Sequence, residues 1–260
     1  GPIGLIISTP LTLCLVVLGR HVQNLEFLDV MFGDRPVLSP EVSFYQRMLA
    51  DDPDEAEEQA ERYLAEKPLL SYYDEVALKG LQLAASDIAR GTLTPVQVDR
   101  LKTSTMHLVS DLDTHSDTSA EEPEGDDAAI SGKPIAPEWQ IPGAVLCVAG
   151  RGQLDEAAAA MLAQLLHKHG IGARAVPHAA VSRAQLGSLD VRSVEMICIS
   201  YLDISGNPAH LRYLIRRLRT RLAEVPILVG LWPAGESVLH DRDLRQAVGA
   251  DYYVSTLREA

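Results

Sequence analysis

The chain has 260 residues, of which 47% are hydrophobic and 23% charged; this is the composition of a globular protein with a core rather than of a disordered chain. Its formal net charge of −13 argues against a nucleic-acid partner, because contacts to phosphates need a surplus of Lys and Arg. An odd number of cysteines in apolar runs (Cys14, Cys147 and Cys198) predicts buried free thiols rather than a disulfide framework.

Residues 1–24 form an apolar opening with no formal charge before Arg20. Pro10 suits the first turn of a helix that extends to about His21, because Ser8 and Thr9 are good N-cap residues. No initiator Met and no basic leader precede the apolar run, so we expect the sequence to begin inside a longer protein. The segment is then the end of a last transmembrane helix; the alternative is a buried helix of a soluble core.

Residues 25–112 have the pattern of an all-helical region. Helices are predicted from Pro40, from Pro53, over 69–89 up to Gly91, and from Pro95 onward, because Pro follows a capping residue in three of them and apolar residues recur at helical spacing. Short turns between four helices favour a small antiparallel array. The acidic residues 54, 55, 57, 58 and 61 are interpreted as a solvated helix face rather than as a metal site, since no His completes a ligand set.

Residues 113–142 are predicted to be an acidic, disordered linker. The stretch from Asp111 to Glu138 contains nine acidic residues and one basic residue, Lys133, which gives it a net charge of −8. The segment is polar, rich in Pro and Gly, and lacks periodicity. Much of the charge excess of the chain therefore lies in this tether.

Residues 143–260 alternate between apolar strand runs and helical patterns. Strands are predicted over 143–150, 173–177, 194–200, 226–232 and 251–256, with helices over 154–170, 208–224 and 241–249, a helix or turn over 182–189, and a further helix beginning at 257. Such alternation predicts an α/β domain with a doubly wound, flavodoxin-like parallel sheet in the order 2-1-3-4-5.

Ligands of such sheets bind beyond the carboxyl ends of the strands. Gly150 and Gly152 follow the first predicted strand and resemble a phosphate-binding loop, because glycine lets the backbone approach a ligand closely. The GxGxxG pattern fails, however, since Asp155 stands at its last position. A tight strand-to-helix turn with Asp155 as a helix-start charge is the favoured interpretation.

Two other groups of residues could carry a function. Ser200, Asp203, His210 and His240 could supply a hydrolase triad, but no GxSxG turn surrounds Ser200, so no catalytic residue is predicted. One basic stripe consists of Arg212, Arg216, Arg217, Arg219 and Arg221. It could meet the acidic linker, another subunit or lipid headgroups, although a solvated outer helix face is the favoured interpretation.

The first 36 residues resemble the C-terminal end of the membrane domain in the autoinducer-2 exporter-like transporter family. The stretch GPIGLIISTPLTLCLVVLG fits that family's pattern GPxGLxxxTPLTxxLxVLG. The resemblance implies a polytopic transporter of the bacterial inner membrane, with residues after about 24 in the cytoplasm. Its partners would be the lipid bilayer, the rest of the membrane domain and, as an open possibility, further copies of the chain.

The last domain resembles a cobalamin-binding domain through the runs AVLCVAG, VEMICIS and PILVGLW and the ending GADYYV. The family's cobalt-ligating His follows its first strand in a DxHxxG loop, whereas this chain has GRGQLDEAA there. We therefore expect neither cobalamin nor any metal. Ser200 and Gly230 match positions that line the family's pocket.

These observations lead to a first hypothesis, which is a non-enzymatic cytoplasmic region that regulates or assembles a membrane transporter. The alternative is a sensor module that binds cobalamin or a nucleotide in a cleft at the carboxyl ends of strands 1, 3 and 4, with Gly150, Gly152, Ser200 and Gly230 as ligand-binding residues. An enzyme that uses Ser200 is a third hypothesis.

Overall fold

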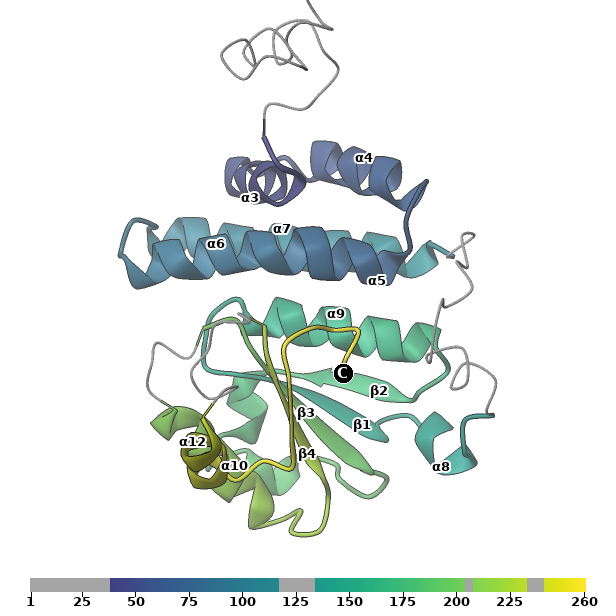
Figure 1. Ribbon diagram of the computed structural model, residues 1–260, viewed down its shortest axis with the longest axis vertical. Helices are drawn as coiled ribbons and strands as arrows, with labels where there is room; N and C mark the ends of the chain where they lie inside the picture. The colour runs from purple at the N-terminus through teal and green to yellow at the C-terminus, as the bar shows by residue number, and fades with distance from the viewer. Residues whose placement is uncertain (1–37, 117–133, 204–207, 233–240) are drawn as a thin grey trace, which may run out of the picture. The chain divides into compact units, whose positions relative to one another are not determined.

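The computed structural model describes residues 38–116, 134–203, 208–232 and 241–260 (Figure 1). The predicted transmembrane segment, residues 1–24, lies outside them. Among the described helices, none combines the length and the apolar character that crossing a bilayer requires. The chain divides into two units, Gly1–Pro40 and Glu41–Ala260, and the architecture below is that of the second.

The helical region predicted before the sheet is confirmed. Thr94 caps one of its helices by accepting from the backbone N–H of Gln97, whose side chain in turn accepts from the N–H of Thr94; Asp52 caps another through Glu55 N. Both caps use donors that the first turn of a helix leaves unpaired. The helices are α3 (Pro40–Ala50), α4 (Pro53–Leu64), α5 (Leu69–Tyr72), α6 (Leu78–Ala89) and α7 (Pro95–Asp111), which continues into the 3₁₀ turn η3 (Leu112–Thr114).

The helix predicted over 69–89 contains a π-helical turn. This turn, η2 (Tyr73–Ala77), joins α5 to α6 without a break in the backbone. Tyr73 is fully buried, and its hydroxyl donates to the side-chain oxygen of Gln164 in the α/β part. The extra residue of a π turn shifts side chains around the helix axis, which periodicity in the sequence does not reveal.

Five parallel strands form the sheet in the order β2-β1-β3-β4-β5, as predicted. The strands are β1 (Val145–Ala149), β2 (Ala173–Val176), β3 (Met196–Tyr201), β4 (Ile227–Leu231) and β5 (Tyr252–Val254). The helical elements between them are α9 (Asp155–Lys168), the 3₁₀ turns η5 (His178–Val181) and η6 (Leu186–Ser188), α10 (Ala209–Arg219) and α12 (Arg242–Val248). The helix predicted to begin at residue 257 is only a turn.

The two faces of the sheet bury separate cores. Along β1, Cys147 faces the core shared with α9 and the helical region, whereas Leu146 and Val148 face the core under α10, because successive strand residues point to opposite faces. Cys147 and Cys198 are free and buried, as predicted, and burial raises the pKa of both thiols. Figure 1 shows α9 on one face of the sheet and α10 with α12 on the other.

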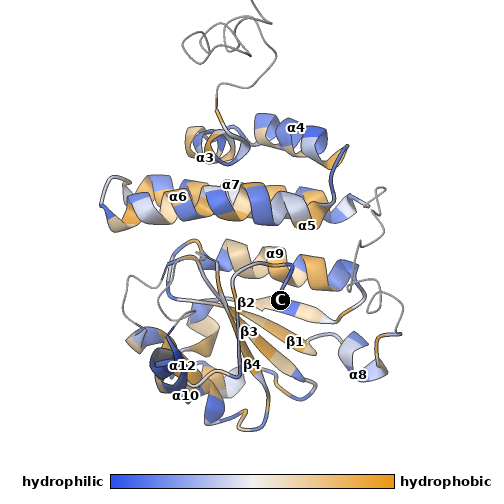
Figure 2. Cartoon of the chain, viewed as in Figure 1, coloured by the Kyte–Doolittle hydropathy of each residue, from blue (hydrophilic) through white to orange (hydrophobic). Residues whose placement is uncertain are grey.

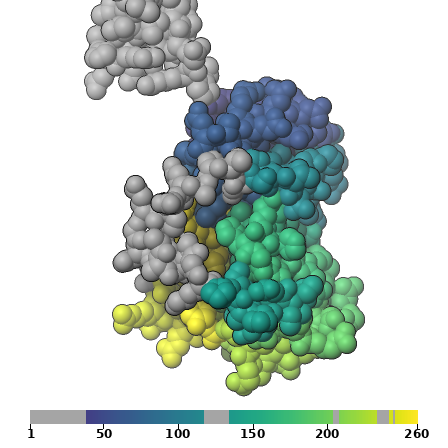
Figure 3. Space-filling view, turned by 90° about the vertical axis from the view of Figure 1, so that its right-hand side faces the viewer, coloured from purple at the N-terminus to yellow at the C-terminus, as the bar shows by residue number. Residues whose placement is uncertain are grey.

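The helical region packs against the outer side of α9, so that α9 lies between two layers (Figure 1). Gln164 on α9 links them, since its amide nitrogen donates to Val109 O at 2.6 Å while its oxygen accepts from Tyr73. The apolar stripes of the helices, orange in Figure 2, alternate with polar ones as expected for amphipathic helices with one buried side. In the space-filling side view, the helical region, in blue, is in direct contact with the α/β part, in green (Figure 3).

The disorder predicted for 113–142 is wrong at both ends of that range. At the N-terminal end, Asp113 and Thr114 belong to η3, and Lys168 donates to Asp113 O at 2.7 Å. The C-terminal end is helical as well. A short helix, α8 (Pro137–Gln140), precedes β1, and the carbonyl of Trp139 accepts from Gly172 N at 2.7 Å. Trp139 is partly buried against the core. An aromatic side chain in a polar segment can therefore anchor it, because its buried apolar area offsets the entropy lost on ordering. Residues 117–133 lie outside the described ranges.

Candidate functional site

Asp155, the first residue of α9, holds the turn after β1. It is only 1% exposed, and its Oδ2 accepts from Gly152 N at 2.7 Å while Oδ1 accepts from Leu202 N at 2.9 Å. Gly150 N donates to Ser200 O at 2.9 Å. The carboxylate therefore ties the β1–α9 turn to the end of β3.

The two glycines of this turn make room for that carboxylate. A Cβ on Gly152 would lie 2.9 Å from Asp155 Oδ1, and one on Gly150 would lie 2.8 Å from Ser200 O and meet Asp155 Oδ2 as well. The Gly152 N–H that a phosphate would use is already donated to Asp155. This is the geometry of a tight strand-to-helix turn whose N–H group is occupied by the carboxylate of Asp155. Such a turn is unfavourable for binding a phosphate.

The pKa of Asp155 is raised to about 7, chiefly by burial; the hydrogen bonds from Leu202 and Gly152 lower it, and the neighbouring charges of Asp203 and Glu156 raise it. Desolvation outweighs these two hydrogen bonds because it disfavours the charged form. Asp155 thus changes its charge near neutral pH, in a turn at the edge of the sheet.

A cavity of ≈ 400 Å³ lies beside this turn. Its walls come from three directions: the last two turns of α6, the β1–α9 turn, and residues at the end of β3 (201–203) together with residues 210 and 211 of α10. The lining residues are Ala85, Ile88, Ala89, Arg151, Gly152, Gln153, Leu154, Asp155, Tyr201, Leu202, Asp203, His210 and Leu211. The helical region therefore closes a cavity at the carboxyl edge of the sheet, the place where ligands of such sheets bind.

A few polar groups face this largely apolar cavity. The guanidinium of Arg151 contacts the imidazole of His210. Tyr201 is 4% exposed, and its hydroxyl has no hydrogen-bond partner among the described residues. A planar guanidinium suits a carboxylate, and a buried hydroxyl without a partner is costly unless a ligand or water satisfies it.

The predicted ligand-binding residues do not come together as one site. Gly152 lines the cavity, whereas Gly150, Ser200 and Gly230 are absent from its lining. Ser200 is fully buried in β3, in register with Ala149 and Gly230, and its hydroxyl has no hydrogen-bond partner within the described ranges. Gly230 lacks a side chain because the indole of Trp232 occupies that space.

The residues of the hydrolase hypothesis do not come together as one site among the described residues either. Asp203 and His210 line the cavity, but the Ser200 hydroxyl is enclosed in the sheet and His240 lies outside the described residues. A nucleophile must be reachable from the base that activates it and from the substrate. The arrangement gives no support to Ser200 as a nucleophile.

Sequence reasoning missed the residues that build the cavity. In the sequence, Arg151 lies between two glycines, Tyr201 directly follows a predicted strand, and α6 has only the pattern of an amphipathic helix. The one available signal was the position of Arg151 and Tyr201 at the carboxyl ends of β1 and β3, where such sheets bind ligands. Nothing in the sequence places Ile88 of α6 beside them.

The residues present do not fit cobalt ligation. The β1–α9 turn contains no His, and the imidazole of His210 is engaged by Arg151. Across the described part of the chain, no three His, Cys, Asp or Glu side chains come together as metal ligands.

The sequence matches no protein-family description and no curated protein. The fold is similar to a crystal structure described as a novel cobalamin-binding protein from Desulfitobacterium hafniense DCB-2. The two share 12% identity over 83% of this chain and 92% of that one, with a TM-score of 0.34. A similarity of this degree does not identify a ligand for this chain.

Proposed function

We propose that residues 38–260 form a non-enzymatic, small-molecule-sensing module that regulates a membrane transporter from the cytoplasmic side. The observation that supports sensing is the cavity between α6 and the carboxyl edge of the sheet. Its volume falls within the range of about 300–1,000 Å³ that is typical of small-molecule sites. A ligand there would contact both the helical region and the Asp155-linked turns, so its binding would bias their arrangement.

The lining indicates the kind of ligand. Ile88, Leu154, Leu202 and Leu211 supply apolar walls, and Arg151 supplies a cation. A small, largely apolar molecule with one acidic group fits this combination, the acid taking the guanidinium in place of His210. Cobalamin is not part of the proposal, and a nucleotide phosphate is disfavoured because Gly152 N–H is already bonded to Asp155.

The transporter assignment rests on a different observation, the resemblance of the first 36 residues to the autoinducer-2 exporter-like family. On this proposal those residues end a membrane domain in the bacterial inner membrane. The described module then follows in the cytoplasm, where it could also assemble with further copies of itself.

Filling the cavity tests the sensing function. Ala89 lies on the exposed side of α6 and lines the cavity. The substitution Ala89→Trp should therefore fill the cavity without disturbing the core. The matched control is Ala65→Trp, at an exposed helix end. The probe is a panel of small aliphatic and aromatic carboxylic acids, read as shifts in melting temperature. We expect acids that stabilise the native chain and the control but not Ala89→Trp. A panel without any shift, or shifts that persist in Ala89→Trp, would contradict sensing at this cavity.

The transporter assignment has its own test. The reading frame upstream of Gly1 should encode several more apolar spans. The chain of residues 1–260 should sediment with bacterial inner membranes, and residues 38–260 should not. An initiator Met directly before Gly1, or equal partitioning of the two chains, would overturn this part of the proposal while leaving the sensing function open.

A further inference from the structure

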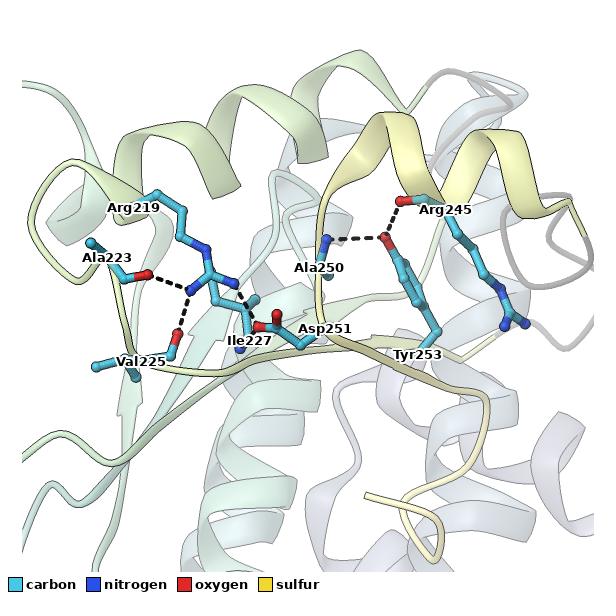
Figure 4. Close-up of polar contacts among 8 residues, drawn as sticks. All are labelled: Arg219, Ala223, Val225, Ile227, Arg245, Ala250, Asp251 and Tyr253. Atoms are coloured by element: carbon cyan, nitrogen blue, oxygen red, sulfur yellow. Dashed lines mark hydrogen bonds and ion pairs between the residues drawn. The ribbon is translucent and has the colours of Figure 1, made fainter.

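The basic stripe in and after α10 contains arginines with different roles. Two of its arginines hold neighbouring segments in place through hydrogen bonds. Arg219 donates to Ala223 O at 3.0 Å and Val225 O at 2.6 Å and pairs with Asp251 at 2.5 Å (Figure 4). It thereby fixes the loop between α10 and β4.

Arg221 is the second structural arginine. Its guanidinium donates to the carbonyl of Leu186 in η6, so the η5–η6 segment is fastened to the end of α10. Leu186 and Val181 of that segment are buried in the core under α10. The segment is therefore a fixed wall rather than a loose loop.

Between this wall and α10 runs a groove of ≈ 490 Å³, lined by Arg183, Leu186, Tyr213, Arg216, Arg217 and Thr220. We call it the arginine groove. The guanidinium groups of Arg183, Arg216 and Arg217 make no ion pair or hydrogen bond with another described residue, although the backbone carbonyl of Arg217 accepts from the Thr220 hydroxyl. Tyr213 is 57% exposed, and the Arg212 guanidinium lies over its ring at 5.8 Å from the centroid.

The positive charge of this groove is unusual for a chain with a net charge of −13. No acidic residue is among the described residues that line it. The negative end of the helix dipole favours cations in the last turn of α10, and this explains why Arg216 and Arg217 are each favourable there. It does not account for Arg183, which comes from a different segment. Three like charges in one groove repel each other unless an anion joins them.

We propose that the arginine groove is a binding site for a phosphate ester whose non-phosphate part lies against the ring of Tyr213. Guanidinium groups bind phosphate oxygens through paired hydrogen bonds, and an exposed aromatic ring offers a face for stacking or apolar contact. The source of the phosphate ester is either a free metabolite or an anionic lipid headgroup.

The site is separate from the cavity of the proposed function. It lies under the opposite face of the sheet from α9 and the helical region, and shares no lining residue with the cavity. Either site can fail without affecting the other.

The probe is phenyl phosphate, titrated by calorimetry at low ionic strength into the whole chain, with inorganic phosphate as a second ligand. Arg216→Gln/Arg217→Gln should weaken binding of phenyl phosphate about tenfold or more, because two charge-assisted hydrogen bonds are lost. Arg62→Gln/Arg90→Gln removes the same charge from exposed sites in the helical region and should leave binding unchanged. Tyr213→Ala should weaken phenyl phosphate severalfold and leave inorganic phosphate unaffected.

Sedimentation with vesicles distinguishes the two sources. Binding to vesicles that contain phosphatidylglycerol but not to pure phosphatidylcholine, with the same loss in Arg216→Gln/Arg217→Gln, assigns the lipid headgroup; binding of phenyl phosphate without vesicle binding assigns a free ester. The proposal is overturned if neither probe binds, or if the groove variant and the Arg62→Gln/Arg90→Gln control lose binding equally.

Discussion

The carboxylate of Asp155 lies 2.9 Å from the backbone nitrogen of Leu202, 47 residues further along the chain. With its other oxygen it accepts from Gly152, so one buried side chain joins the turns that follow β1 and β3. Both turns line the cavity. The ionisation of Asp155 is therefore linked to the geometry of the proposed ligand site.

Asp155 should make stability depend on pH. Its pKa rises from 3.8 in the unfolded chain to about 7 in the folded one, so the folded state holds the proton more tightly. This contribution to the free energy of unfolding is complete below about pH 4 and is lost as the pH rises through about 7, a difference of roughly 4 kcal/mol. Asp155→Asn cannot ionise and should lose this part of the pH dependence.

Urea unfolding of both chains at about pH 5 and about pH 8 measures the effect. At the lower pH, where the folded Asp155 is protonated, Asp155→Asn should cost about 1–3 kcal/mol, because the amide NH2 would face a backbone N–H from which the hydroxyl oxygen of the acid can still accept. The deficit should shrink at the higher pH. Asp54→Asn, at an exposed position of α4, is the control. An unchanged deficit at both pH values would contradict an ionising Asp155.

The β1–α9 turn should not tolerate side chains at its glycines. Gly150→Ala would press a methyl group against the Ser200 carbonyl and Asp155, and overpacking of this kind costs about 1–3 kcal/mol. Gly187→Ala is the matched control, since a Cβ there meets nothing within 4 Å. Chemical unfolding should give little change for the control, and equal effects of the two substitutions would refute the close approach.

The C-terminal segment should depend on Asp74 in the π-helical turn. Asp74 Oδ1 accepts from Leu257 N at 2.7 Å and Oδ2 from Arg258 N at 3.2 Å, and Leu257 is buried in the core shared with the helical region. Asp74→Ala should cost about 1–3 kcal/mol and speed amide exchange at residues 257 and 258. Asp99→Ala, exposed on α7, should change neither, and unaltered exchange in Asp74→Ala would rule out this anchor.

Arg219 and Asp251 should show coupling in a double-mutant cycle. Asp251 accepts from Ile227 N at 2.7 Å as well as from Arg219 (Figure 4), so both residues stabilise the start of β4. We expect a coupling energy of about 0.5–2 kcal/mol between Arg219→Gln and Asp251→Asn in urea unfolding. Additive effects would show that the ion pair contributes nothing beyond the backbone contacts of each partner.

Much of the fold could be predicted. Continuous apolar runs such as 227–231 alternate with amphipathic helices, and that alternation leaves little choice but a parallel sheet with helices on its faces. Caps such as Asp52 and Thr94 place helix starts because their hydrogen bonds are local. The ordered C-terminal end of the predicted linker was missed, because the anchoring of Trp139 depends on Gly172, which is far away in the chain.

The candidate site was harder to predict. The sequence shows two glycines and an acid after a strand, a pattern compatible with a phosphate loop or with a tight turn. Only the three-dimensional position of the Asp155 carboxylate, between Gly152 N and Leu202 N, distinguishes the two. Likewise, Ser200 and Gly230 lie at the expected end of the sheet, yet the pleat buries one and Trp232 covers the other.

The sequence alone predicts the five strands and the main helices between them, the order of the sheet and the free, buried state of Cys147 and Cys198, because periodicity, capping and apolar runs act over short distances. The tertiary structure decided that α6 closes a cavity at the sheet edge and that Asp155 occupies the donors of the Gly-rich turn. It also separated the structural arginines of α10 from those that line an open groove. These features depend on contacts between segments tens of residues apart, and packing alone brings such segments together.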